Sequence, residues 1–459
     1  MKKRVRVEKD ALGELKVPSE AYWGINTARA LVNFPVSGRP VHRRIVEAYV
    51  RVKRAAATVN EKSGLLGKRP AAALRRACDG VLEGKLRDQF VVDAYQAGAG
   101  TSTNMNVNEV LCNRALELLR KPKGDYRTLH PNDHVNRSQS TNDTYPTALR
   151  LAALDALRAF YPEAMALAAS FFRLGRRYAR ILKSGRTHLS DAVPVTLGAE
   201  FRAYGSALRA AIRNIKRAAD GLRELGIGGT GTGTGLNTPP GYPGKMAREL
   251  SRLTKFRLRA SRDLFKAMQS QAPAADTAAA LRGFAVELDR IANDLRLLSS
   301  GPATGLAEIG LPAVQAGSSF MPGKINPSIL EMVNMVAFRV IGNDQTIAWA
   351  AAAGQLELNV MMPVMAEALL ESIELLTAGC RQMRTRCVDG IKADVRRCRE
   401  YAFRSPAIVT VLVPALGYAK AAELAKRAVS RKENVIEIVR REKLLSEKDL
   451  KNLLRKLIS

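Results

Sequence analysis

Three segments rich in Ser, Thr and Asn interrupt a sequence that otherwise favours helix, and each stands directly before a helical pattern. They are GAGTSTNMNVNEV with Thr101, HPNDHVNRSQSTNDTYP with Ser140, Thr141 and Asn142, and AGSSFMPGKINPS with Ser318. The first turn of a helix offers unpaired N–H groups and the positive end of the helix dipole. Hydroxyl and amide side chains gathered there are suited to binding a carboxylate. Plain N-capping needs only one such residue per helix, so these dense segments are candidate anion sites.

The third segment is a candidate catalytic loop over residues 317–327. It is punctuated by Gly and Pro and holds four polar residues that can do chemistry: Ser318, Ser319, Lys324 and Asn326. Pro327 is predicted to start the next helix, with Asn326 near its N-cap. A loop of this kind can close over an acidic substrate and bring a hydroxyl to the reacting carbon and an ammonium to a carboxylate. It matches neither a GxSxG nucleophile elbow nor a GxxxxGK[ST] phosphate loop.

Two further segments contain possible site residues. His188 stands in GRTHLSDAVP beside Thr187, among small and polar residues, although a solitary histidine is more often structural. The run GGTGTGTGLN at 228–237 looks like a nucleotide-binding loop, but no strand pattern precedes it and no acidic residue follows at dinucleotide spacing. We expect this run to be a flexible connection that lines a cleft.

The elements that must position these residues are predicted to be helices. After an irregular first segment of about 40 residues, the pattern is helical from Arg43 to the C-terminus. The helix predicted over 276–299 has apolar residues at alternating spacings of three and four, at Leu281, Phe284, Leu288, Ile291, Leu295 and Leu298. This is the seam of a left-handed helical bundle. Other long helices are predicted to open at Pro146 and to cover 328–353 and 357–386, and their apolar stripes suggest that subunits share the bundle.

These patterns predict an all-α fold, and 459 residues are too many for a single core. We expect a mostly helical N-terminal domain at 1–140, a central helical bundle with the catalytic loop at 141–393, and a small helical C-terminal domain at 394–459. No run approaches the ~20 apolar residues of a membrane span, and no signal-peptide core is present. We therefore expect a cytoplasmic protein without a membrane partner. Five cysteines without a CxxC pair predict free thiols.

The charge balance is strongly basic, with 73 Lys and Arg against 43 Asp and Glu, a net charge of +30. A basic stripe would indicate nucleic-acid binding. Here the basic residues are dispersed and interleaved with acidic ones, which favours a positive field that attracts small anionic substrates. A general basic bias of the proteome is the simplest alternative.

The motif AGSSFMPGKINP resembles the signature GSSxMPxKxNP of the aspartase/fumarase superfamily. GTSTNMNVNEV, SQSTND, GRTHLSDAVPVTLG and LGYAKAAELAK also resemble blocks of that family, so the resemblance covers nearly the whole chain. It implies an all-helical, three-domain subunit whose central domains form a twenty-helix core in a homotetramer. It also implies elimination of an amine or water to give fumarate, without a metal or organic cofactor.

Several motifs resemble the ammonia-lyase branch rather than the hydratase branch, namely GAGTSTNMN, NDHVN, SQSTND, DAVP, QAGSS and GQLELN. The implied reaction is the reversible deamination of L-aspartate to fumarate and ammonia through an aci-carboxylate intermediate. Fumarate hydratase is the alternative, and a non-catalytic, basic nucleic-acid-binding helical protein is a remote one that would be expected to have lost site residues. Phe320 departs from the usual Ile of the signature, which puts substrate range and loop motion in question.

The resemblance also implies a role for each site residue. Ser318 would be the general base, with Lys324 nearby to stabilise its alkoxide. The residues implied to bind the β-carboxylate are Thr101, Ser140, Thr141 and Ser319. Lys324, Asn326 and Thr187 would hold the α-carboxylate, and Asn142 and His188 would orient the departing amine. In the family, the Thr101/Ser140 group, the Thr187/His188 group and the Ser318 loop come from three different subunits.

Overall fold

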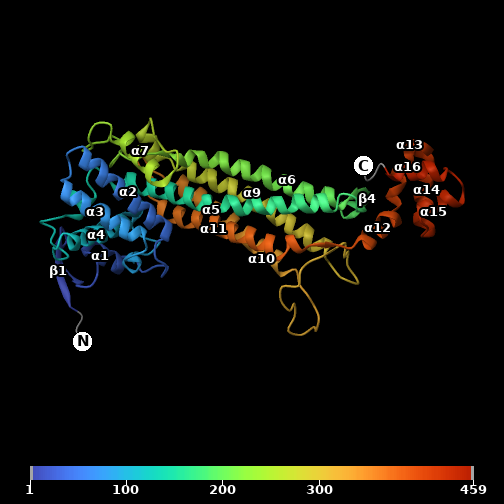
Figure 1. Cartoon of the computed structure of the whole chain (residues 1–459), viewed down its shortest axis with the longest axis horizontal. Helices are drawn as coiled ribbons and strands as arrows, with labels where there is room; N and C mark the ends of the chain where they lie inside the picture. Colours follow the sequence, from blue (N-terminus) through green and yellow to red (C-terminus); the bar gives the residue numbers. More distant parts are fainter. Residues whose placement is uncertain (1–3, 456–459) are drawn as a thin grey trace. The chain divides into compact units, whose positions relative to one another are not determined.

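The computed structural model describes residues 4–455 and is mainly helical (Figure 1). The chain forms two compact units. The first comprises Met1–Phe160, Asn214–Gly283 and Arg339–Leu375, and the second comprises Tyr161–Arg213, Phe284–Phe338 and Leu376–Ser459. No helix of the described residues is long and apolar enough to cross a membrane.

The first unit contains the N-terminal elements. Its strands are the antiparallel pair β1 (Val5–Asp10) and β2 (Gly13–Pro18), and the parallel pair β5 (Glu224–Leu225) and β6 (Arg259–Ala260). Its shorter helices are α1 (Ile25–Asn33), α2 (Arg43–Lys62), α3 (Lys68–Leu82), α4 (Thr101–Leu118), α7 (Tyr242–Thr254) and α8 (Leu264–Gln269). The sequence predicted an irregular start, but residues 4–40 contain a hairpin and a helix. The hairpin turns where Asp10 accepts a hydrogen bond from the Leu12 N–H and Gly13 adopts a positive φ.

Five long helices continue from one unit into the other. They are α5 (Thr141–Arg177), α6 (Leu197–Ala218), α9 (Ala272–Leu298), α10 (Ser328–Ala352) and α11 (Met362–Arg386) (Figure 1). The predicted apolar seam of α9 is buried along its whole length, as expected for a bundle helix. Polar contacts join neighbouring helices within each unit, such as Arg282 to Asp344 in the first and Arg296 to Asn334 in the second.

Three helices begin at residues other than those predicted. α9 begins at Ala272 and not at 276, and the other two, α5 and α11, contain a proline near their starts. α5 begins at Thr141 because Ser140 and Asp143 form a capping box, so Pro146 lies inside the helix and not at its start. α11 begins at Met362, which places Pro363 in the first turn, where a missing N–H costs nothing.

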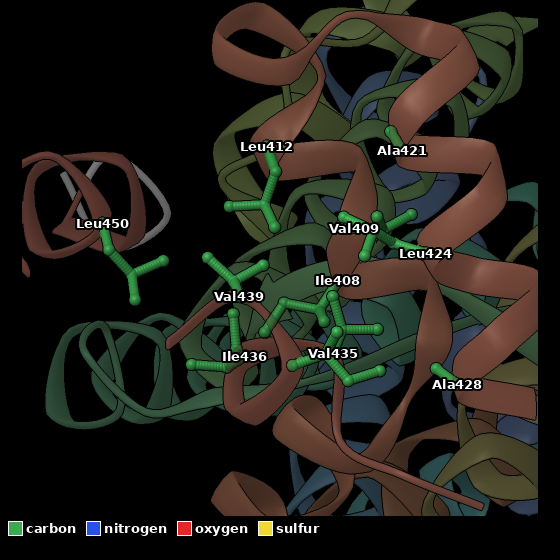
Figure 2. Packing of buried hydrophobic residues seen from close by; sticks show 11 residues of the cluster. Ile408, Val409, Leu412, Ala421, Leu424, Ala428, Val435, Ile436, Val439 and Leu450 are labelled. Carbon is green, nitrogen blue, oxygen red and sulfur yellow. The ribbon is translucent and has the colours of Figure 1, made fainter. Parts of the chain in front are cut away.

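The second unit contains the antiparallel hairpin β3 (Leu182–Thr187) and β4 (Ser190–Thr196), and the short pair β7 (Ile309–Gly310) and β8 (Lys392–Ala393). Its C-terminal helices are α12 (Val395–Arg404), α13 (Val413–Leu416), α14 (Tyr418–Arg431), α15 (Val435–Arg441) and α16 (Glu447–Arg455). A separate apolar core joins the C-terminal segments, and Leu412, Leu424 and Val439 are among its buried residues (Figure 2). All five cysteines are buried and free, and burial raises the pKa of each thiol.

Candidate active site

The N-termini of α4 and α5 bring together the predicted carboxylate-binding residues of the first unit. Thr101 is the exposed first residue of α4. Gly100 precedes it at φ +78°, and a Cβ added there would lie 1.9 Å from the ring of Tyr145 in α5. Glycine therefore allows the start of α4 to pack directly against α5.

Hydrogen bonds at the start of α5 fix the three predicted residues there. The Ser140 hydroxyl accepts from the Asn142 N–H at 3.2 Å, and the Ser140 N–H donates to Asp143 at 3.0 Å. Thr141 is buried, and its Oγ1 accepts from Asn104 Nδ2 of α4 at 3.0 Å. Thr101, Ser140, Thr141 and Asn142 thus lie at two adjoining helix N-termini, an arrangement suited to a carboxylate.

Behind these residues lies Lys53, which sequence reasoning missed. Its Nζ is buried and donates to Asn104 Oδ1 at 2.7 Å, Asn136 Oδ1 at 2.8 Å and Gln139 Oε1 at 3.0 Å. Burial lowers the pKa of Lys53 to about 7. Through Asn104, the lysine fixes the hydroxyl of Thr141. One signal was available in the sequence, because Lys53 follows buried Tyr49 by four residues and so lies on the apolar face of α2.

The pKa of Lys53 predicts a change of stability with pH. Between pH 7 and the ordinary lysine pKa of about 10.5, the unfolded chain binds a proton at this residue that the folded chain does not, so this residue makes the protein more stable as the pH rises. We expect Lys53→Met to remove the part of the increase in the free energy of unfolding with pH that this residue causes. Urea unfolding at several pH values from 7 to about 9.5 measures it.

Lys62→Met is the matched control for this experiment, because Lys62 is exposed at the end of the same helix. We expect the control to keep the wild-type slope of stability against pH. Equal slopes for Lys53→Met and the wild type would contradict the lowered pKa.

Asp143 is a second buried group that the sequence analysis did not select. Its Oδ2 accepts from the N–H groups of Gly228 and Thr230 at 2.9 and 3.1 Å. Burial raises the pKa of Asp143 to about 6, although three backbone hydrogen bonds and Lys53 act in the opposite direction. The side chain of Asn142 adds a hydrogen bond to the carbonyl of Gly231 at 2.8 Å. The beginning of the run 228–237 is therefore anchored to the start of α5.

In the second unit, the β3–β4 hairpin carries Thr187 and His188. Thr187 pairs with Ser190, and the two residues between them, His188 and Leu189, both have positive φ, at 55° and 59°. Positive φ at both central residues is the pattern of a type I′ turn, which normally prefers Asn or Gly. Thr187 and His188 are exposed at this strained tip, where both can meet a ligand.

A buried ion cluster supports the base of this hairpin. Glu308 is fully buried, forms an ion pair with Lys183 at 2.9 Å and accepts a hydrogen bond from Arg186 at 2.9 Å. Lys183 also donates to Glu200 at 2.7 Å. Because Glu308 directly precedes β7, the cluster ties β3 to the chain that leads into the 317–327 loop. Removing one charge of such a cluster would leave an unpaired buried ion.

The predicted catalytic loop is held at its base and exposed at its tip. The Gly317 N–H donates to the carbonyl of Lys324 at 2.8 Å, and Asn326 Nδ2 donates to the carbonyl of Gly317 at 2.5 Å. Phe320 is 88% exposed, and Ser319 and Lys324 are exposed too. Asn326 lies near the cap of α10, as predicted, two residues before the helix begins. The carbonyl of Pro327 accepts from the first turn of α10, while the side chain of Asn326 closes the loop.

The hydroxyl of Ser318 accepts hydrogen bonds from two backbone N–H groups of the loop. Its Oγ accepts from the Met321 N–H at 2.8 Å and the Phe320 N–H at 3.1 Å. Donors in these positions stabilise negative charge on the oxygen, which an alcohol needs if it is to act as a base. Among residues 4–455, no group of three or more His, Cys, Asp or Glu side chains is arranged to hold a metal ion.

Comparison with known proteins identifies the family. A lyase family model matches residues 13–342, and a model of the fumarase C C-terminus matches residues 408–457. The chain belongs to the aspartase/fumarase superfamily. The aspartate ammonia-lyase of Escherichia coli strain K12 is 45% identical over 456 residues, 99% of this chain and 95% of the relative. The aspartate ammonia-lyase of Pseudomonas aeruginosa is 46% identical over 452 residues, 98% of this chain and 95% of the relative.

Solved structures of superfamily members have the same fold. The fumarate lyase:delta crystallin from Brucella melitensis, bound to cobalt, matches with a TM-score of 0.96 and 47% identity over 99% of both chains. The recombinant class II fumarase from Schistosoma mansoni matches with a TM-score of 0.93 and 36% identity over 98% of both chains. The predicted superfamily and its mainly helical fold are confirmed. The described residues also contain four short pairs of strands outside the helices.

Proposed function

We propose that the protein is an aspartate ammonia-lyase, a carbon–nitrogen lyase that converts L-aspartate reversibly to fumarate and ammonia. The observation that carries this proposal is the identity of 43–46% with several aspartate ammonia-lyases over 98–99% of the chain. The site residues of the ammonia-lyase motifs are all present at their positions. A dicarboxylate substrate follows from the superfamily and fits a chain of net charge +30.

The reaction requires the enzyme to stabilise an unusually charged intermediate. The proton on the carbon beside the β-carboxylate is weakly acidic, and its removal gives an aci-carboxylate with two negative charges on that group. Preorganised donors must stabilise this charge. Thr101, Ser140 and Thr141 at the starts of α4 and α5 would supply hydroxyls and helix N-termini, and Ser319 would add a further hydroxyl from the loop.

Ser318 would remove the proton as the general base. The N–H groups of Phe320 and Met321 already point at its Oγ, and Lys324 of the same loop would add positive charge on closure. Lys324 and Asn326, together with Thr187 of the hairpin, would hold the α-carboxylate.

The departing amine would be oriented by Asn142 and His188. Asn142 Nδ2 is already engaged with the Gly231 carbonyl, so its Oδ1 is the atom left to interact with a ligand. An oxygen acceptor suits an ammonium group, which is a donor only. This polarity favours an amine as the leaving group.

We also propose that the protein is a cytoplasmic homotetramer whose sites are shared between subunits. In support, α10 exposes Met335, Phe338 and Trp349, at 64, 61 and 77%. These residues recur at helical spacing on one face, and an apolar face of this kind is typical of a subunit contact.

The test is a comparison of two substrates. We expect pure protein to form fumarate from L-aspartate much faster than from L-malate, followed by the ultraviolet absorbance of fumarate, with release of one ammonia per fumarate from aspartate. Malate turnover equal to or above aspartate turnover would instead identify a fumarate hydratase, the alternative that the 36% identity with a class II fumarase represents.

A further inference from the structure

A cavity of about 890 Å³ in the second unit is unrelated to the residues assigned above. It lies between the turn after α5, the start of β3, and helices α12, α15 and α16. Six basic residues from these elements line it: Arg180, Arg396, Arg399, Arg440, Lys451 and Arg455. The acidic residues that line it are Glu400 and Glu437. The lining therefore carries a clear excess of positive charge.

Most of these cations lack a carboxylate partner. Arg440 pairs with Glu447 at 2.9 Å, outside the lining, and Glu400 pairs with Arg404 at 3.1 Å. Within the described chain, residues 4–455, no carboxylate lies within 4.0 Å of the basic groups of the other five. Gathering like charges around a hollow is unfavourable unless an anion joins them.

Some arginines of the neighbouring surface do have carboxylate partners. Arg427 pairs with Glu442 and Arg441 pairs with Glu433, both in the same C-terminal region but away from the cavity. Carboxylates thus neutralise these two arginines, whereas five of the six basic residues that line the cavity have no such partner among the described residues. Guanidinium groups left free in a concave site are typical of phosphate recognition.

Apart from Asn434, the rest of the lining is apolar, which indicates an organic ligand and not a bare inorganic ion. Phe403, Ile436 and Leu454 form part of the wall, and Arg399 lies over the Phe403 ring at 5.6 Å. The volume lies within the range of roughly 300–1,000 Å³ for small-molecule sites. We propose that this cavity binds a nucleoside polyphosphate, with its phosphates on the arginines and its base against the apolar wall.

The probes are ATP and inorganic tripolyphosphate, titrated calorimetrically onto the whole protein at about 0.15 M ionic strength, where long-range attraction by the net charge of the protein is largely screened. We expect ATP to bind at one site per chain and more tightly than tripolyphosphate, because only ATP can use the apolar wall. Tripolyphosphate binding as tight as ATP would overturn the nucleoside part of the proposal. Failure of ATP to bind would overturn all of it.

Two double variants distinguish ATP binding in the cavity from ATP binding by the general positive charge of the protein. Arg396→Gln with Arg399→Gln should weaken ATP binding at least about tenfold, since each guanidinium would be lost from a charge-assisted contact. The matched control is Arg431→Gln with Arg441→Gln, which removes equal charge from exposed positions of the same region outside the cavity. Equal weakening by both pairs would show that ATP binds by diffuse charge and would contradict the site. Circular dichroism and aspartate turnover of each variant verify the fold.

Discussion

Replacing Ser318 with alanine is expected to lower kcat by about 10²-fold or more while leaving the fold and the binding of an unreactive dicarboxylate nearly unchanged. The side chain supports little packing, since it lies in a loop whose neighbours Ser319 and Phe320 are exposed. Its Oγ accepts the N–H groups of Phe320 and Met321, which marks it as the oxygen on which the loop can stabilise negative charge. Loss of that oxygen removes the base but leaves the proposed carboxylate-binding residues in place.

The measurement is kcat with L-aspartate, together with the affinity for succinate as the unreactive dicarboxylate. Ser328→Ala is the matched control, because this serine begins α10 directly after the loop and has no proposed chemical role. We expect the control to keep most of its activity. Retention of more than about a tenth of kcat by Ser318→Ala would remove Ser318 as the base, and a large loss of succinate binding would mean that the change had disturbed the loop.

Features that depend on a local pattern were predictable from the sequence. The buried seam of α9 follows from spacings of three and four, and the loop at 317–327 follows from Gly, Pro and a specific motif. Ser140, Thr141 and Asn142 were predicted to stand before a helix; Ser140 does, whereas Thr141 and Asn142 are the first two residues of the helix itself. The first residue of that helix was placed wrongly because a proline suggested one start, while the capping box of Ser140 and Asp143 fixed an earlier one.

Features that depend on contacts between distant segments were not predictable. Lys53 meets Asn104, Asn136 and Gln139, which are 51 to 86 residues away in the chain. Asp143 and Gly228 are 85 residues apart. The same holds for the cationic cavity, because its arginines are dispersed in the sequence and gather only when α12, α15 and α16 pack. Burial shifts the pKa of Lys53 and of Asp143, and the residue types alone do not reveal burial.

Mixing two inactive variants is expected to restore about a quarter of the wild-type activity. The proposed tetramer takes the Ser318 loop and the Thr187 group of one site from different subunits. In equal mixtures of Ser318→Ala and Thr187→Ala chains, a site receives an intact loop with a probability of one half and an intact Thr187 with a probability of one half, so about one quarter of the sites are complete.

The structure of the hairpin suits this arrangement. Thr187 and His188 are exposed at the tip of β3 and β4, while the buried cluster of Lys183 and Glu308 fixes the base of the hairpin within its own chain. A rigid base and an exposed tip allow the tip to serve a site on another subunit. The experiment co-refolds the two variants, verifies mixed tetramers by mass, and compares their activity with each variant refolded alone. Mixed tetramers without activity would mean that both groups act in one chain, because no chain in the mixture carries both intact residues.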